Sequence, residues 1–313
     1  MTELCALAGV SRSGYYRWVA AIPAKLEREK QDREDFQRIL DVYNYRGYRK
    51  GVRSIYARLF RLGKPMNKKK IRRLMRKYGL LCPIRKANPY RRLAKALKTD
   101  ATAENALNRE FFEHGPRKFL LTDITYLRLN GSFCYLSVIT DCYTSEVLAY
   151  QLSESLEIQF VLDTVNQLIR DHGMTLDSKT YIHSDQGCHY TSVSFRNLLK
   201  EKTLMQSMSR KGNCWDNAPQ ESFFGHMKDE LKPQMKHWET IENVQASIDD
   251  WMDYYNNERY RSDLHMMAPK EYYHFLTTGE LPEGVKAPKT KERKKPAKKD
   301  KTDIKDQNSD VTA

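Results

Sequence analysis

The sequence predicts a two-part chain in which a basic helical region precedes an α/β domain. Charge is the first observation: residues 1–110 carry 28 Lys and Arg against 10 Asp and Glu, whereas residues 111–285 carry 16 against 25. Hydrophobic periodicity is the second, because helical spacing gives way after Pro116 to runs rich in β-branched residues. The order of the later elements is the third, since strands and helices alternate as in a mixed sheet that helices cover on both faces.

Residues 1–20 have the pattern of the second half of a helix-turn-helix. Gly9 suits the turn, and Ser11 is a typical N-cap for the helix that follows. Residues 24–42 then predict a charged helix. An ordinary helical hairpin would show the same pattern, so this stretch alone does not define a function.

Residues 52–77 carry a stronger pattern of two helices. Apolar side chains recur at helical spacing from Val52 to Leu62, and the stripe ends at Gly63. Asn67 precedes a second, densely basic helix, which fits contact with a phosphate backbone, although a solvated face is the alternative for any single cation. The cations predicted to bind DNA from this helix are Lys68, Lys69, Lys70, Arg72, Arg73 and Arg76.

Three strands are predicted after Pro116, and Asn130-Gly131 is a typical hairpin turn between the first two. A helix, a buried strand, a helix, another strand and two further helices follow. The predicted strands span 118–129, 132–144, 146–153, 180–185 and 204–209. The predicted helices span 157–172, 191–202, 217–231 and 240–257.

Composition limits the remaining possibilities. No apolar run approaches the ~20 residues that a membrane span needs, and the first residues do not resemble a secretory signal. We therefore expect a cytoplasmic, nucleoid-associated protein without membrane contact. None of the six cysteines forms a C-x-x-C pair, which argues against a zinc ribbon or a redox motif. The predicted divisions are a basic helical region (1–82), a linker (83–115), a catalytic core (116–278) and a basic disordered tail (279–313).

Three carboxylates stand out by position. Asp123 interrupts an otherwise apolar strand, Asp185 follows a short buried strand, and Glu221 lies in the first turns of a helix. Each has a structural explanation alone, and Glu221 suits a helix start in any protein. Together they match the oxygen ligands that divalent metals need for phosphoryl transfer. His183 and His189 flank Asp185 and form an alternative metal set, but supporting or DNA-proximal positions are favoured for them.

The surrounding segments resemble a known family. Asp123 in LLTDITYLRL, Asp185 in HSDQGCHYTS and Glu221 in SRKGNCWDNAPQESFFGHMKDEL are similar to three blocks of the integrase-core transposases, and more narrowly of the second-reading-frame (OrfB) proteins of bacterial insertion sequences. Sixty-one residues separate the first pair and 35 the second, and the 35-residue gap is typical of this family. The resemblance also covers YRGYRKG, KKKIRRLMRKYGL and YYNNERYRSDLHMMAPKEY, so it extends over roughly residues 4–275.

The resemblance implies a fold, an activity and ligands. It implies a ribonuclease-H-like core, with a mixed five-stranded sheet and flanking helices, after a small basic helical DNA-binding region. It implies metal-dependent cleavage of phosphodiesters at element ends, followed by strand transfer during DNA integration. The three carboxylates would hold Mg²⁺, or Mn²⁺ in its place, with two ions expected. Lys228 would contact DNA near the scissile phosphate, and Asn217 and Arg259 are further expected DNA contacts.

The expected partners are double-stranded DNA, as terminal inverted repeats and target, and further copies of this chain on paired ends. An upstream-frame protein, fused by ribosomal frameshifting, is another, in which case this chain is the catalytic half. Two alternatives stay open: another integrase-like nuclease, and a non-catalytic or domesticated DNA-binding remnant. Retroviral integrases carry an N-terminal His/Cys zinc module that this sequence lacks, and all three carboxylates are present at the family spacing.

Overall fold

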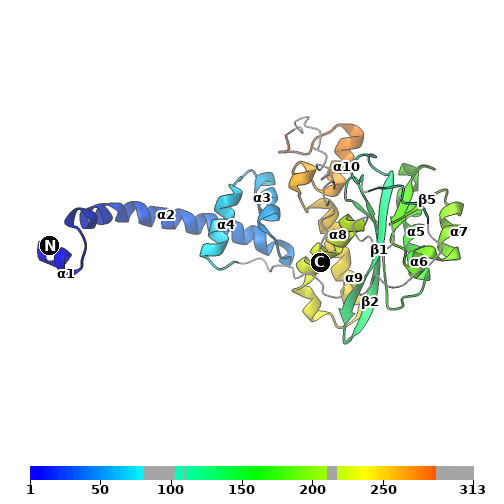
Figure 1. The fold of residues 1–313 in the computed structure, drawn as a ribbon, viewed down its shortest axis with the longest axis horizontal. Coiled ribbons are helices and arrows are strands. Elements are labelled where there is room, and N and C mark those ends of the chain that lie inside the picture. Colours follow the sequence, from blue (N-terminus) through cyan, green and yellow to red (C-terminus); the bar gives the residue numbers. More distant parts are fainter. Residues whose placement is uncertain (81–102, 109, 210–216, 287–313) are drawn as a thin grey trace, which may run out of the picture.

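A computed structural model describes residues 1–80, 103–108, 110–209 and 217–286 of the chain. Basic helices (blue and cyan in Figure 1) stand beside a core in which helices lie on both faces of a sheet. Among the helices in these ranges, none combines the length and the apolar character that crossing a membrane requires.

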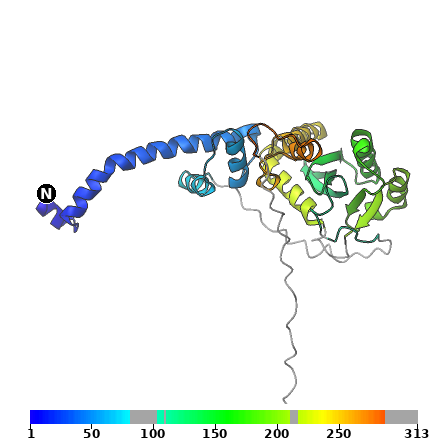
Figure 2. The same ribbon diagram turned by 90° about the horizontal axis from the view of Figure 1, so that it is seen from above.

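The chain begins with a projecting arm. Helix α1 (Thr2–Leu7) is followed by the 33-residue helix α2 (Arg12–Asn44). Gly9 turns the chain with a φ of +64°, and Ser11 Oγ caps α2 by accepting from the Gly14 amide at 3.1 Å, as predicted. The two helical stretches expected on either side of Pro23 are one helix, because a proline removes a single amide donor and bends a helix without always ending it. Figure 2 shows this part of α2 curving away from the body.

Helices α3 (Val52–Arg61) and α4 (Lys68–Lys77) pack against the C-terminal half of α2. Both were predicted, and Asn67 caps α4 by accepting from the Lys69 amide at 2.8 Å. We call residues 27–80 the helical module and residues 1–26 the arm. The module has a hydrophobic core of its own, formed by Ile39, Val42, Ile55, Leu59, Met66, Ile71, Leu74 and Met75.

The core contains the predicted mixed five-stranded sheet, in the order β3-β2-β1-β4-β5. Strands β1 and β3 are each antiparallel to β2, whereas β4 pairs in parallel with β1 and with β5. Asn130 and Gly131 both have positive φ, as the predicted two-residue hairpin turn requires. The strands are β1 (Phe119–Leu129), β2 (Ser132–Asp141), β3 (Val147–Ser153), β4 (Tyr181–Ser184) and β5 (Met205–Met208).

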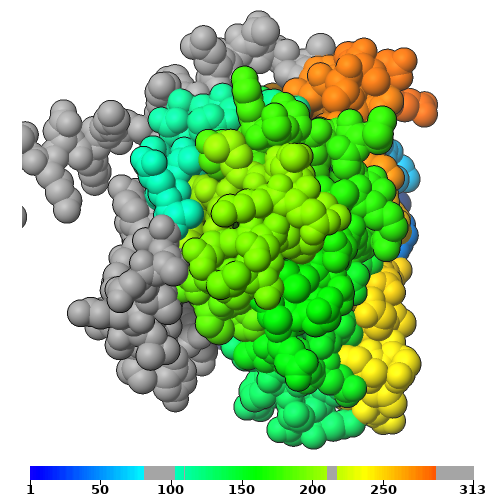
Figure 3. All heavy atoms as spheres, turned by 90° about the vertical axis from the view of Figure 1, so that its right-hand side faces the viewer, coloured from blue at the N-terminus to red at the C-terminus, as the bar shows by residue number. Residues whose placement is uncertain are grey.

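Helices cover both faces of this sheet, and each face has its own hydrophobic cluster. One face carries α5 (Gln159–His172), α6 (Cys188–Thr191) and α7 (Val193–Glu201), and the green and yellow-green atoms of this region occupy the centre of the view in Figure 3. The other carries α8 (Ala218–Leu231) and α9 (Ile241–Asn257), and α10 (Pro269–Thr278), which was not predicted, packs on α9. Short 3-10 helices are η1 (Tyr45–Gly47), η3 (Gly173–Thr175), η5 (Gln234–His237) and η6 (Ser262–Leu264).

Part of the segment expected as a linker lies against the core. The Ala106 amide donates to Ser207 Oγ at 3.0 Å, and the Met208 amide donates to the backbone oxygen of Glu104 at 3.3 Å. Leu107 is buried against Phe119 and its neighbours. Residues 81–102 of the expected linker, and most of the expected tail, lie outside the described residues.

Candidate active site

Strand pairing places Asp123 and Asp185 side by side. In the parallel pairing of β1 with β4, Leu121 lies opposite His183. Two residues further along, β1 reaches Asp123 and the chain leaving β4 reaches Asp185. Because residues two apart on a strand face the same way, the continued register brings the two carboxyl groups to one level on neighbouring strands. Sixty-one residues of chain therefore separate two acids that the sheet brings together.

Asp123 is half-buried in β1, where the Ile124 amide donates to its Oδ1 at 2.8 Å. Burial, together with the negative charge of Asp185, raises the pKa of Asp123 to about 8. The Ile124 amide and the cation of Lys228 act in the opposite direction. A carboxyl group with so high a pKa is one whose charged form needs a further cation nearby.

Asp185 is held by the turn after β4. The Gly187 amide donates to Asp185 Oδ1 at 2.9 Å, and a Cβ atom at position 187 would lie 2.9 Å from that same oxygen. A glycine is therefore required there if the carboxylate is to keep this position. The pKa of Asp185 is also raised, chiefly by burial, while the Gly187 amide and His189 lower it.

Glu221 lies on a helix, α8, and not on the sheet. It lies in the first turn of α8, half-buried, and α8 packs against β1 and carries Lys228, whose charge acts on Asp123. Within the described ranges, no three His, Cys, Asp and Glu side chains are close enough together to hold a metal ion. The structure thus brings two of the three predicted carboxylates together and leaves Glu221 on the neighbouring helix without completing a three-ligand set.

The two histidines near Asp185 are engaged elsewhere. His183 is fully buried, and its two ring nitrogens bond to Ser207 Oγ at 2.9 Å and Ser209 Oγ at 3.1 Å. His189 Nε2 lies 2.8 Å from the backbone oxygen of Leu156. Both rings therefore help to build the site, and this arrangement does not favour the alternative metal set that includes them.

Two of the predicted DNA contacts, Asn217 and Arg259, are buried. The side-chain oxygen and nitrogen of Asn217, at the N-cap position of α8, have no hydrogen-bond partner among the described residues. Arg259 forms a buried ion pair with Glu230, and its Nη2 and Nε donate to Glu230 Oε1 at 2.7 Å and 3.0 Å. A phosphate contact by Arg259 would require this buried ion pair to break.

The cations of α4 fall into two groups. Some face acids of α2: Arg73 forms a bidentate pair with Asp32 at 2.7 and 2.8 Å, and Lys70 pairs with Asp35. Lys77 likewise pairs with Glu29 and Asp32. In contrast, the exposed Lys69, Arg72 and Arg76 have no ion-pair partner among the described residues, and Lys68 lies over the Tyr56 ring. The acids of α2 recur every three residues, so their spacing was the signal that sequence analysis missed.

A cavity of about 450 Å³ lies between the helical module and the core. Arg53 and Ser54 of α3 line one side of it, and Ser222 and His226 of α8 line the other. None of the three predicted carboxylates lines this cavity. The cavity therefore lies at the interface between the helical module and the core and is not the carboxylate site.

A mixed sheet with Asp123 on β1 and Asp185 directly after β4, beside a basic helical module, is the architecture expected of an integrase-type polynucleotidyl transferase. Residues 113–214 match the integrase core domain family, residues 202–269 match a second integrase core domain family, and residues 30–88 match an HTH-like domain.

Relatives place the chain more narrowly. It is 33% identical, over 87% of its own length and 93% of the relative's, to an Escherichia coli (strain K12) protein assigned as transposase InsK of insertion sequence element IS150. It is 31% identical, over 80% and 90%, to a Mycobacterium tuberculosis protein assigned as a transposase of IS986/IS6110. The chain belongs to the insertion-sequence transposases with an integrase core, and it is an insertion-sequence DNA transposase with a ribonuclease-H-like fold. These matches favour a transposase over the alternative of another integrase-like nuclease.

Solved structures similar to the chain come from retroviral integrases. The catalytic core domain of HTLV-2 integrase, in complex with magnesium, matches 51% of this chain and 97% of its own, with 13% identity and a TM-score of 0.40. The catalytic core domain of BIV integrase matches 52% and 98%, with 21% identity and a TM-score of 0.41.

Proposed function

We propose that this transposase cuts phosphodiesters at the ends of its element and joins the freed strands to target DNA, with Asp123, Asp185 and Glu221 as its catalytic, metal-binding carboxylates. One observation carries the proposal: Asp123 on β1 and Asp185 directly after the neighbouring β4 lie at one level, and the pKa of each is raised. Two adjacent acids whose charged forms are disfavoured gain most from a divalent cation. Glu221 supplies a third ligand from α8.

The donors suit magnesium, with manganese as a substitute, because all are carboxylate oxygens and magnesium prefers hard oxygen ligands. Asp123, Asp185 and Glu221 would hold two Mg²⁺ ions, and the bound ions would supply a lower pKa for the attacking water and neutralisation of charge on the leaving 3′-oxygen. The chain itself orients the ligands: the Ile124 amide holds Asp123, and the Gly187 amide holds Asp185. No protein nucleophile is required, because water attacks first and the freed 3′-hydroxyl attacks next.

The remaining parts bind and align DNA. Lys228 carries a positive charge beside Asp123, suited to a phosphate next to the cleaved bond. Lys68, Lys69, Arg72 and Arg76 of α4 present exposed cations to the DNA backbone of a terminal inverted repeat. We further propose that residues 1–82 bind DNA and residues 116–278 form the catalytic core. We also propose that further copies of the chain pair the two element ends and that the chain can be fused to an upstream-frame protein. We expect it to act at the nucleoid in the cytoplasm.

The test uses the full chain with Mg²⁺ or Mn²⁺ and a duplex bearing the inverted-repeat end of its own element. End-specific nicking is resolved on a denaturing gel. Asp185→Asn and Glu221→Gln should each slow nicking by about 100-fold or more while leaving DNA affinity within about twofold of the parent. Asp163→Asn, the same change at an exposed position on α5, is the matched control and should nick at the parental rate.

Variants that nick as fast as the parent would show that these carboxylates are not the catalytic ligands. A parent that binds ends but never nicks, even with Mn²⁺, would favour the non-catalytic remnant. Nicking that begins only when the upstream-frame protein is fused to the chain would make this chain the catalytic half.

A further inference from the structure

The segment 45–51, YRGYRKG, forms a tight turn that joins α2 to α3. Arg46 and Gly47 are both left-handed, with φ of +54° and +67°. Glycine adopts this conformation freely, but arginine does so at a cost that surrounding contacts must offset. The turn therefore holds the Arg46 side chain in a direction that an extended or helical backbone would not give it.

A buried lysine stabilises the turn from inside. Lys50 is 1% exposed, and its ammonium donates to the backbone oxygens of Tyr48 at 2.9 Å, Tyr43 at 3.3 Å and also Tyr45. Carbonyl groups at the end of a helix lack partners within that helix, and a cation satisfies them and the helix dipole together. Burial lowers the pKa of Lys50 to about 8.

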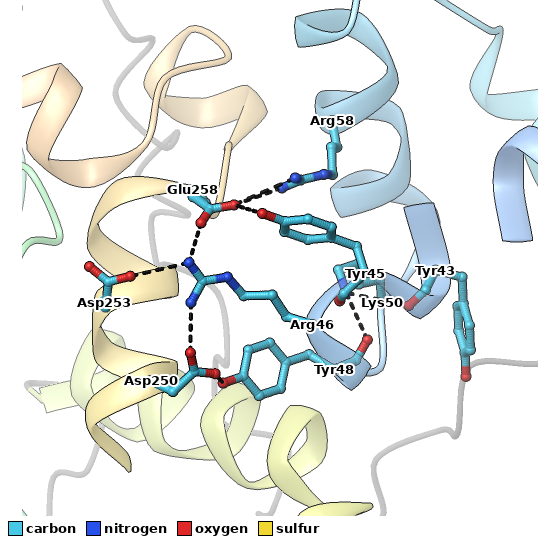
Figure 4. A network of polar contacts seen from close by, with 9 residues as sticks. All are labelled: Tyr43, Tyr45, Arg46, Tyr48, Lys50, Arg58, Asp250, Asp253 and Glu258. Carbon is cyan, nitrogen blue, oxygen red and sulfur yellow. Dashed lines mark hydrogen bonds and ion pairs between the residues drawn. The ribbon is translucent and has the colours of Figure 1, made fainter. Parts of the chain in front are cut away.

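The Arg46 guanidinium reaches three carboxylates at the end of α9 (Figure 4). Its Nη1 lies 2.7 Å from Asp250 Oδ1, and its Nη2 lies 3.3 Å from Asp253 Oδ2 and 2.5 Å from Glu258 Oε1. Acids near a helix C-terminus oppose the helix dipole, and α9 contains no Lys or Arg that could offset them. The compensating cation comes instead from the helical module.

Neighbouring side chains extend the contact. Figure 4 shows the Tyr45 hydroxyl donating to Glu258 and the Tyr48 hydroxyl donating to Asp250. Tyr48 is 1% exposed, and its ring packs 5.0 Å from that of Tyr254, so the contact includes a buried aromatic pair. Arg58 of α3 adds a second cation to Glu258 at 3.4 Å.

The end of α3 makes a second, independent contact with the core. Arg61 Nη2 lies 2.7 Å from Glu271 Oε1 at the start of α10, and its guanidinium lies over the Tyr260 ring at 4.6 Å. The module is thus fixed at two separated points, although its hydrophobic core is separate from those of the sheet. Two points of attachment restrict rotation, which one contact alone would not.

We propose that residues 45–51 are an interdomain clamp, and that Arg46 is a positioning residue that fixes the basic face of α4 relative to Asp123 and Asp185. Arg46 acts through α9 and does not bind DNA, because three carboxylates already occupy its guanidinium. The role of the clamp in cleavage rests on the proposed function, whereas the docking of the module on α9 does not depend on it.

Hydrogen exchange on the full chain, without DNA, tests the docking. Arg46→Ala should speed amide exchange in residues 45–51 and 248–258 by about tenfold or more, while the helices around Ile55 and Leu74 keep their protection. Arg49→Ala is the matched control, because it removes the same charge from the same turn and Arg49 has no partner in the described part of the chain. It should leave residues 248–258 protected.

The position of cleavage tests the alignment. On the inverted-repeat duplex, Arg46→Ala should bind with the parental affinity and salt dependence, within about twofold, but spread its nicks over neighbouring phosphodiesters. Simple loss of stability would lower the amount of nicking without moving it. Arg46→Lys keeps one cation facing the three acids and should recover most of the parental cleavage position.

Each outcome decides the proposal. Parental exchange in residues 248–258 of Arg46→Ala would overturn the clamp. A weaker salt dependence in Arg46→Ala would make Arg46 a DNA contact, which also overturns it, and so would nicking that stays at the parental position. A parent that does not nick would count against the proposed function alone, since the exchange experiment still decides the docking.

Discussion

Asp123 lies half-buried in β1, and its pKa of about 8 has a thermodynamic consequence. Between about pH 4 and pH 8 the folded chain keeps a proton on this group that the unfolded chain has released. The free energy of unfolding therefore falls progressively as the pH rises through that window, because unfolding releases this proton. A bound divalent cation would reverse the loss, since it stabilises the ionised form.

We predict that Asp123→Asn stabilises the metal-free chain, because the amide cannot ionise. The gain in melting temperature over the parent should grow from pH 5 to pH 8, level off above that, and correspond to roughly 1–3 kcal/mol at pH 8. Added Mg²⁺ or Mn²⁺ should raise the melting temperature of the parent at pH 8 and leave that of Asp123→Asn unchanged. Thermal unfolding with metal or EDTA measures both effects.

Asp163→Asn controls for loss of an exposed carboxylate and should keep the parental response to metal. Two results would count against Asp123 as a ligand: a parent whose melting temperature ignores both metals at pH 8, or an Asp123→Asn chain that responds to them as the parent does.

At the scale of elements, the local sequence pattern predicted where helices and strands begin and end better than it predicted which elements lie next to one another. Asn67 and Gly79 bracket α4, and Asn130-Gly131 fixes the β1–β2 hairpin, because caps and turns depend on residues adjacent in sequence. The parallel pairing of β1 with β4, which brings Asp123 and Asp185 together, was not predicted from the strands, and their convergence was expected only from the family resemblance. The continuity of α2 through Pro23 was not predictable, because packing and length decide whether a helix survives a proline.

The cations of α4 looked alike in sequence, and the structure now separates them. We predict that Arg72→Ala and Arg76→Ala each weaken binding to DNA and reduce the dependence of log affinity on log salt by about one unit. Arg73→Ala should change the salt dependence little, because Asp32 already neutralises Arg73, and should instead lower the melting temperature by leaving Asp32 without its bidentate partner.

Fluorescence anisotropy across a salt series measures the first effect, and thermal unfolding measures the second. If Arg73→Ala loses as much salt dependence as Arg72→Ala, the ion pair with Asp32 opens on DNA, and the whole face of α4 is the contact.

At the scale of the whole molecule, the decisive contacts are those that no local pattern records. Arg46 and Asp250 are 204 positions apart, and neither belongs to a periodic stripe that would reveal its partner. The sequence marks YRGYRKG as a distinctive segment, yet its contact with α9 depends on how the module and the core dock. Glu221 is a similar case, since its helix is predicted but its distance from the strand acids is set by tertiary packing.

The arm differs from the rest because it projects from the body (Figures 1 and 2) and exposes Leu4, Leu7, Trp18 and Leu26. We predict that removing residues 1–26 changes the melting temperature by less than about 2 °C, because these residues bury little apolar surface. The shortened chain should also self-associate less, since exposed apolar side chains promote association.

Removing residues 1–40 is the contrasting variant. It deletes Ile39 from the core of the module and Asp32 from its pair with Arg73, so the module should unfold. Thermal unfolding and light scattering distinguish the two truncations, and a large loss of stability on removing residues 1–26 would mean that the arm packs against the body in solution.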